Sequence, residues 1–166
     1  MHNIPLLAEL EQEAAATLTF LESVPADKLD WRPHAKSMTL GQLALHVATL
    51  PAAMCELATL DSFDVNDADF LPTSPESADV LVPTFHASVE QAASFLAGLD
   101  EDASMQDWQL HQGGEELFTV PKIALLRSLF LNHWYHHRGQ LSVYLRLLDV
   151  PVPVTYGRSA DINPFA

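Results

Sequence analysis

The sequence predicts an all-α protein, a four-helix bundle with long connections and room for a small hairpin before the last helix. Apolar residues recur at three- and four-residue spacing in four segments, residues 4–23, 39–60, 77–98 and 121–148. No internal repeat or low-complexity segment interrupts them, and 166 residues suit a single core. Hydrophobic residues make up 48% of the chain, which is typical of a globular protein. We therefore expect one domain over residues 1–166.

The first predicted helix, residues 4–23, has leucines on one stripe with glutamates between them, the pattern of an amphipathic helix. Pro25 ends it, because proline lacks an amide hydrogen and clashes with the preceding turn. The connection that follows, residues 25–38, is expected to fold Leu29 and Trp31 back onto the core.

The second predicted helix, residues 39–60, opens at Thr39, and Gln42 three residues later completes a capping box. Pro51 lies in its interior, where it removes a backbone hydrogen bond and kinks the helix. The kink falls just over one turn after His46. The pattern leaves open whether it re-aims the helix around a site or only marks a bend.

The middle of the chain mixes loops with one helix. Residues 61–76 are acidic and polar with two prolines, and we expect a long surface loop there. The third helix covers residues 77–98, and Pro83 suggests that a separate short turn precedes its main part. Residues 108–111 and 117–120 flank a Gly-Gly pair, which predicts a small hairpin.

The fourth predicted helix, residues 121–148, contains the most distinctive stretch. His133 and His137 are four residues apart, so they share one helix face with Cβ atoms roughly 6 Å apart. Such a pair can close on one metal ion from the same side. Gly139 lowers helix stability by roughly 1 kcal/mol relative to alanine, so we expect it to admit a neighbouring backbone.

A third ligand is available in the second helix. His46 shares an apolar stripe with leucines, where a histidine is unfavourable unless its nitrogens have partners. Two ordinary interpretations stay open, because His-x-x-x-His recurs by chance in a chain with eight histidines, and a histidine on an apolar face is often only a hydrogen-bonded core residue. No His-Glu-x-x-His is present, so the metalloprotease motif is absent. The spacing therefore supports a three-histidine metal site as a hypothesis.

The charge balance excludes several classes of partner. The formal net charge is −14, and a field of that sign repels phosphate backbones and anionic lipid surfaces. It also favours a small-molecule substrate that is not strongly anionic, unless the charge of a metal dominates locally. Every long apolar run is broken by His, Pro or a charge before the ~20 residues of a membrane span. The single Cys55 is expected to be a buried apolar residue in a cytoplasmic protein.

Longer stretches of the chain carry a family resemblance. They are Asn132-His133, the run from His136 to Arg146, Val152-Pro153, Tyr156-Gly157, Ser159-Ala160-Asp161, and His46 with the later Leu50-Pro51. On these residues the chain resembles the DinB-like superfamily of small bacterial metalloproteins (the damage-inducible helical family), over nearly its whole length. The resemblance implies a four-helix bundle, frequently dimeric, with a divalent metal held by three histidines. By motif position these fall on His46, His133 and His137.

Two further residues near these histidines are candidates for a catalytic role. His136 could be a group behind the ligands, a proton acceptor or an interface residue. Gln140, three residues after His137, could orient a metal-bound water or hydrogen-bond a ligand imidazole. Arg138 is expected to point away and pair with acidic surface groups. Trp134 and Tyr135 are candidates for an exposed aromatic patch, which together with the resemblance predicts a homodimer.

The chemistry of such a site follows from its ligands. Three neutral imidazoles leave an ion with its full charge and an open position, as in catalytic rather than closed structural sites. A water or a thiol bound there would lose its proton near neutral pH. Imidazole suits zinc, nickel, iron and copper alike, so the metal is not fixed. The resemblance implies an enzyme similar to thiol S-transferases that use a low-molecular-weight thiol; a metal-dependent hydrolase and a non-catalytic, metal-braced binding module are the alternatives.

Overall fold

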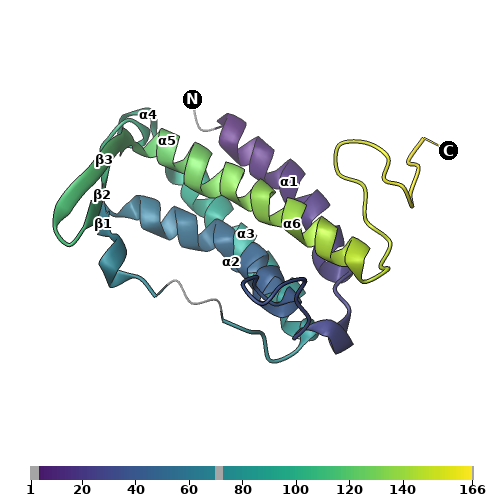
Figure 1. The fold of residues 1–166 in the computed structure, drawn as a ribbon. Helices are drawn as coiled ribbons and strands as arrows, with labels where there is room; N and C mark the ends of the chain where they lie inside the picture. Colours follow the sequence, from purple (N-terminus) through teal and green to yellow (C-terminus); the bar gives the residue numbers. More distant parts are fainter. Residues whose placement is uncertain (1–3, 70–72, 166) are drawn as a thin grey trace.

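The computed structural model describes residues 4–69 and 73–165. Its long helices are α1 (Ile4–Glu22), α2 (Leu40–Thr59), α3 (Leu81–Gly98) and α6 (His133–Leu147). They pack as a bundle in which α2 contacts α3 on one side and α6 on the other, while α1 contacts both α3 and α6 (Figure 1). The predicted bundle is confirmed, and α2 and α6, which carry the three histidines, are neighbours in it.

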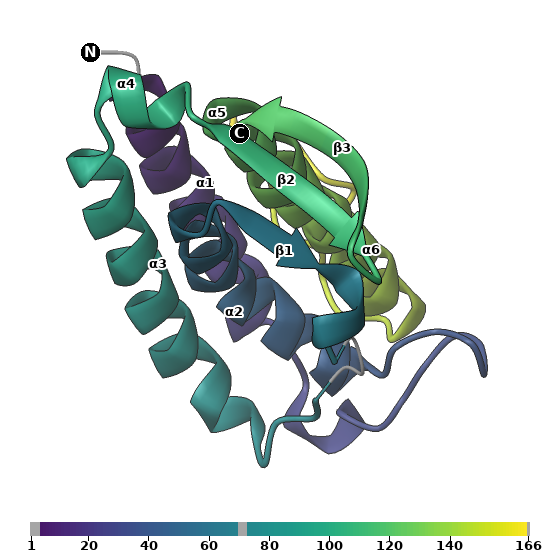
Figure 2. The same cartoon turned by 90° about the vertical axis from the view of Figure 1, so that its left-hand side faces the viewer.

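The protein is not purely α-helical, because a small sheet closes one end of the bundle (Figure 2). Its strands are β1 (Ser62–Asp64), β2 (Asp107–Gln112) and β3 (Glu115–Pro121). The predicted hairpin is the antiparallel pair of β2 and β3, and β1 pairs with β2 in parallel. The expectation of a long surface loop over residues 61–76 is therefore wrong in its first part, where the 3-10 helix η2 (Val65–Asp67) also follows β1, and residues 70–72 of that stretch lie outside the described residues.

The reason for this extra strand lies in Asp64. Its carboxylate accepts hydrogen bonds from the backbone N–H groups of Gly113 and Gly114, at 3.0 and 2.7 Å. Both glycines have positive φ, 62° and 83°, a conformation that side chains disfavour. The acidic residue at the end of β1 thus fastens the hairpin turn to the segment that follows α2. A contact between residues fifty positions apart leaves no local pattern in the sequence.

Short helices complete the remaining connections. They are η1 (Ala26–Lys28), η3 (Ala78–Val80) and α4 (Glu101–Ser104). As predicted, a separate turn precedes the third helix, and Pro83 lies in the first turn of α3. Leu29 and Trp31 pack against the core, and Cys55 is buried, which raises the pKa of its thiol to about 12. By length and hydropathy α2 alone among the described helices could cross a membrane, but half of that stretch is buried inside the bundle.

The start of α2 is fixed by the predicted capping box. The Thr39 hydroxyl accepts a hydrogen bond from the Gln42 N–H at 3.2 Å, and the Gln42 side-chain carbonyl accepts one from the Thr39 N–H at 2.9 Å. These bonds satisfy two donors at the helix start that have no partner within the helix. The register of α2, and hence the direction of His46, is set from this end.

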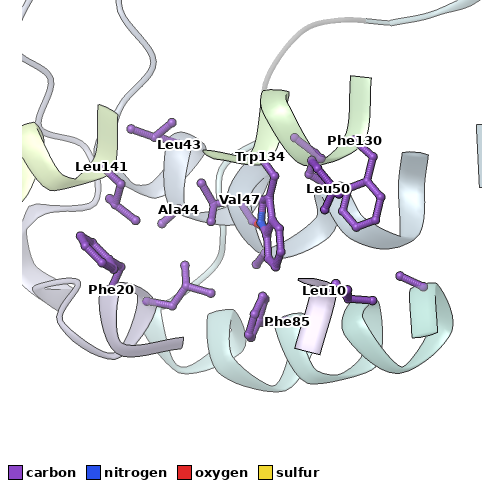
Figure 3. Packing of buried hydrophobic residues seen from close by; sticks show 14 of the residues in the cluster. Leu10, Phe20, Leu43, Ala44, Val47, Leu50, Phe85, Phe130, Trp134 and Leu141 are labelled. Atoms are coloured by element: carbon purple, nitrogen blue, oxygen red, sulfur yellow. The ribbon is translucent and has the colours of Figure 1, made fainter. Parts of the chain in front are cut away.

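The backbone acceptor that Pro51 leaves in α2 is bonded to the last helix. In an α-helix the carbonyl of Val47 would accept from the N–H of residue 51, but Pro51 has none. The indole N–H of Trp134 donates to that carbonyl instead, at 3.0 Å, and the Trp134 side chain is fully buried (Figure 3). An unpaired buried carbonyl is unfavourable by roughly 1–3 kcal/mol. Pro51 therefore creates an acceptor that α6 fills.

A side chain of α3 forms a second set of hydrogen bonds beside Pro51. The Ser88 hydroxyl accepts a hydrogen bond from the Ala52 N–H at 2.9 Å and donates one to the Thr49 carbonyl at 3.2 Å. A single buried hydroxyl thus bonds to one backbone donor and one backbone acceptor beside the proline. Together with Trp134 it bonds the backbone around Pro51 to both neighbouring helices.

The predicted fourth helix is not continuous. It divides into α5 (Lys122–Leu125), the π-helical segment η4 (Leu126–Asn132) and α6, which begins at His133. In a π-helix each carbonyl accepts from the fifth residue on rather than the fourth, so the residues that follow are rotated relative to a continuous α-helix. Such segments are rare and are frequent at functional sites. Apolar periodicity does not distinguish a π from an α turn, which is why the prediction was one helix.

Three predictions about side chains on α6 are wrong. Trp134 belongs to the core, and Tyr135 is half-buried with its hydroxyl donating to Glu9 at 2.7 Å, so they form no exposed aromatic patch. Within the described chain nothing lies within 4 Å of where a Cβ of Gly139 would be, so no neighbouring backbone approaches it. Arg138 does not reach surface acids, because it is buried against α1.

The buried contacts of Arg138 join α6 to α1 and to the C-terminal tail. Its guanidinium forms an ion pair with Glu13 at 2.6 Å, with side-chain exposures of only 4% and 7%. The guanidinium also donates to the Thr17 hydroxyl at 3.1 Å and to the Tyr156 hydroxyl at 2.6 Å. Tyr156 in turn donates to Glu13 at 2.9 Å. A buried pair of charges is tolerable only with such additional hydrogen bonds.

A double-mutant cycle tests the hydrogen bond between the Trp134 indole and the Val47 carbonyl. Trp134→Phe should destabilise the protein, since it leaves the Val47 carbonyl unpaired and removes packing volume. In a Pro51→Ala background residue 51 regains an N–H for that carbonyl, so the same substitution should cost about 1–2 kcal/mol less. Urea denaturation of the four proteins measures the coupling. Equal costs in the two backgrounds would show that the indole bond does not compensate for Pro51.

Candidate metal site

The three histidines predicted as ligands converge between α2 and α6. His46 comes from α2, and His133 and His137 come from successive turns of α6. One ring nitrogen of each lies within 4.8 Å of the others, and the Nε2 atoms of His133 and His137 are 2.7 Å apart. The ring centroid of His46 lies 4.5 Å from that of His137 and 5.3 Å from that of His133. All three side chains are partly buried.

In His133 and His137 the ring nitrogen that points away from the other histidines is hydrogen-bonded, and these bonds determine which nitrogen faces the centre of the cluster. His137 Nδ1 lies 2.8 Å from the side-chain carbonyl oxygen of Gln140, and His133 Nδ1 lies 3.3 Å from the backbone carbonyl of Leu129. Both partners are acceptors, so each Nδ1 carries the proton and donates it. Each Nε2 is left with a lone pair directed toward the other histidines. Outer hydrogen bonds of this kind are what orient metal-ligating imidazoles.

This donor set fits a divalent transition metal. Two Nε2 lone pairs at 2.7 Å repel each other unless a proton or a cation lies between them. Tetrahedral nitrogen ligands at ~2.0–2.1 Å from zinc are about 3.3 Å apart, a separation that lies inside the range from 2.7 to 4.8 Å found here. Small ring movements would therefore suffice to place all three nitrogens on one ion. Neutral imidazole suits zinc, nickel, iron and copper.

The surroundings keep the histidines neutral. Burial lowers the pKa of His46 and of His133 below the ordinary value, and charge repulsion from neighbouring histidines adds to this. Burial lowers the pKa of His137 to about 4; the hydrogen bond to Gln140 acts in the opposite direction, and repulsion from the other histidines lowers the pKa further. Neutral rings at pH 7 are ready to bind a cation, since protons need not be displaced first.

The two residues that were candidates for catalysis lie in different positions. The side-chain carbonyl of Gln140 hydrogen-bonds the imidazole of His137. His136 is exposed, with its ring centroid 5.0 Å from that of His137 and nearly perpendicular to it. A proton acceptor at this position would be open to solvent and next to the cluster.

Sequence reasoning missed the groups that position the ligands. The Leu129 carbonyl is available to His133 in the π-helical segment η4, which no sequence pattern indicated. Trp134 was assigned to the surface, although Pro51 left an acceptor at Val47 that needed a donor. That bond lies one residue after His46 on α2 and one residue after His133 on α6. It therefore fixes the two helices at the level of the histidines.

Comparison with known proteins places the chain in a wider group. An uncharacterized protein, YrdA of Bacillus subtilis (strain 168), is 28% identical over 155 residues, which cover 93% of this chain and 88% of YrdA. A solved DinB-like protein of B. subtilis, YjoA, superposes with a TM-score of 0.70 at 19% identity, covering 92% of this chain and 96% of that one. A DinB-like protein of Bacillus cereus ATCC 10987 gives 0.66 at 23% identity, covering 90% and 95%.

A more distant structure shares the same fold. The H52A mutant of a mycothiol-dependent maleylpyruvate isomerase superposes with a TM-score of 0.54 at 15% identity. The match covers 90% of this chain and 62% of the isomerase. At these identities the likeness to the solved structures concerns the fold alone. The profile of the DinB family, in contrast, matches residues 1–163. The chain belongs to the DinB family.

Proposed function

We propose that the protein is a divalent-metal-dependent enzyme whose metal is held by His46, His133 and His137 and whose nucleophile is a low-molecular-weight thiol. The observation that carries the proposal is the pair of hydrogen bonds that leave the Nε2 lone pairs of His133 and His137 facing each other and His46. Histidines that only fill the core would not need the Nδ1 atoms of both His133 and His137 to donate hydrogen bonds to carbonyl oxygens.

The roles of the residues follow from their positions. His46, His133 and His137 would hold the ion, while Gln140 and the Leu129 carbonyl keep two of the rings in the ligating tautomer. A divalent ion held by three neutral ligands supplies an open position and the charge that favours a thiolate or hydroxide over its protonated form. His136, exposed beside His137, would accept and release the proton.

The choice of a thiol over water draws on a structural neighbour. The isomerase that shares this fold is mycothiol-dependent by its name, and it matches over 90% of this chain. A fold does not determine a reaction, so hydrolysis by an activated water and a metal that only braces the bundle are the competing outcomes. A thiol-conjugation assay with an electrophile, an ester hydrolysis assay and metal analysis on one preparation separate the three.

Substitution of the histidines tests the ligand set. His133→Ala and His137→Ala each leave two ligands, so bound metal should be lost while the apolar core keeps the fold. Gln140→Leu should weaken metal binding about 10–100-fold, the usual effect of removing a partner of a ligating histidine. Competition with a chromophoric chelator measures the affinities, and thermal melting of the metal-free proteins reports the fold.

His136→Ala is the matched control for these variants, because it removes an adjacent exposed histidine of the same helix. It should leave metal affinity unchanged and lower only the rate of thiol conjugation. Full metal occupancy in His133→Ala would contradict the ligand assignment. Metal binding without any reaction of thiol or ester would favour the bracing role.

Acid should destabilise the metal-free protein through the same histidines. In the unfolded chain His137 has the ordinary pKa of about 6.5, and burial lowers it to about 4 in the fold. Between these values the unfolded state binds more protons, so stability falls as the pH drops from about 6.5 toward 4. Urea denaturation with chelator present should show a steeper loss from pH 7 to pH 5 for the wild type than for His137→Gln. Parallel losses would exclude a buried neutral His137.

We also propose that the protein is a cytoplasmic homodimer. Trp134 is buried and Tyr135 half-buried, so neither offers an apolar surface to a partner. Gly139, Val143 and Leu147 form an exposed stripe on α6, and the side chains of Val143 and Leu147 are each 55% exposed. Sedimentation velocity at micromolar concentration should give about twice the 18.3 kDa chain mass. Val143→Glu should then shift the species to the monomer, whereas a wild-type monomer would contradict the proposal.

A further inference from the structure

Acidic residues are absent from the two stretches that form the metal site. Residues 31–55 and 117–148 contain no Asp or Glu, although the chain has 22 of them. The same stretches contain six of its eight Lys and Arg residues. The net charge of −14 therefore describes the rest of the molecule and not the helices that carry the histidines.

Most of these six cations are neutralised by carboxylates from elsewhere. The ion pairs are Lys122–Asp61, Arg127–Glu9, Arg138–Glu13 and Arg146–Asp161. Arg32 and Lys36 are left, and both are exposed without an ion pair to any carboxylate in residues 4–69 and 73–165. Asp30 is the nearest acid along the chain. Two positive charges thus stand free on one connection.

This connection is fastened to both helices of the site. The Trp31 ring packs edge-on against Tyr144 of α6 with centroids 5.6 Å apart, and the Tyr144 hydroxyl donates to the Met38 carbonyl at 3.1 Å. The Trp31 carbonyl accepts from the N–H of Leu40, the first residue of α2, at 2.8 Å. In Figure 2 the connection between α1 and α2 projects from the bundle on the side of α6.

Helix geometry gives the separation from the metal site. Tyr144 lies seven residues after His137 on α6, and Leu40 lies six residues before His46 on α2. At 1.5 Å per residue the two anchor points are roughly 9–11 Å along the helices from the histidines. Arg32 and Lys36 belong to the connection that these contacts fasten at that end of the site.

We propose that the substrate is anionic, with a carboxylate or phosphate group held by Arg32 and Lys36 while its reactive atom lies at the histidines. The inference rests on the proposed function and names its substrate class. The guanidinium of Arg32 presents paired N–H donors that match either anion, and Lys36 adds a point charge. This revises the expectation, drawn from the net charge, of a substrate without strong negative charge. Charge near the binding position governs recognition, and the distant acids are screened within about 8 Å at physiological ionic strength.

Calorimetric titration of zinc-loaded protein with two thiols tests the proposal. The probes are 8-mercaptooctanoate, whose extended chain matches this separation and ends in a carboxylate, and 8-mercapto-1-octanol, which is neutral and of the same length. The double variant Arg32→Gln/Lys36→Gln should bind 8-mercaptooctanoate roughly tenfold more weakly than the wild type and 8-mercapto-1-octanol equally well. Arg158→Gln is the matched control, since Arg158 is also exposed and without an ion pair in the described chain. It should bind both thiols as the wild type does.

A second titration keeps the result independent of thiol chemistry. Succinate and glycerol 2-phosphate are added to metal-free protein, and the fluorescence of Trp31, next to Arg32, reports occupancy. A fluorescence response that disappears in the double variant supports the proposal of an anionic substrate. If neither thiol binds to the zinc-loaded protein while this response is present, only the thiol part of the proposed function fails. The two probes show whether carboxylate or phosphate is preferred. Equal affinity of the wild type for both thiols, or an anion response unchanged in the double variant, overturns the proposal.

Discussion

The hydrogen bond from the Trp134 indole to the Val47 carbonyl is the contact on which the geometry of the site depends. Pro51 frees this carbonyl, and the donor comes from the residue that follows His133. A bond at this place fixes the distance between α2 and α6 and their relative height. Because His46 and His133 are the preceding neighbours of the bonded residues, the same bond positions their side chains. Pro51 thus leaves an acceptor through which α6 is bonded to α2 beside the histidines.

The other side of α6 is fixed by charge. Arg138 follows His137 directly and binds Glu13 of α1 and Tyr156 of the C-terminal tail. Desolvating such a pair offsets much of its attraction, so its contribution lies less in stability than in specifying one arrangement. Rotation of α6 about its axis would break this pair and the Trp134 bond together. Trp134 and Arg138, four residues apart on α6 and bound to different elements, therefore hold His137 toward the centre of the site.

The sequence predicted the features that depend on local patterns. Helix positions, the Thr39 capping box, the hairpin around Gly113-Gly114 and the pairing of His46 with His133 and His137 follow from periodicity, spacing and resemblance. The features it missed depend on distant contacts. The strand β1 exists because Asp64 meets the hairpin turn, and the burial of Arg138 needs Glu13 from α1.

Two errors had a different cause. The π-helical segment before His133 has the same apolar spacing as an α-helix, so its hydrogen-bond pattern is invisible in the sequence. Trp134 is predicted, with Tyr135, as a candidate for an exposed aromatic patch, although the carbonyl freed by Pro51 is a reason to expect a buried donor. An unpaired acceptor created by proline is a signal that sequence reading can use elsewhere.

The central claim is that three imidazoles, and no other protein groups, surround one metal ion. X-ray absorption at the zinc edge of the loaded protein tests it most directly, because imidazole rings give a characteristic outer-shell scattering. We expect three imidazole nitrogens at about 2.0–2.1 Å, with the outer-shell signal reduced to two rings in His133→Ala. A shell of sulfur or carboxylate oxygen, or three imidazoles unchanged in that variant, would contradict the account.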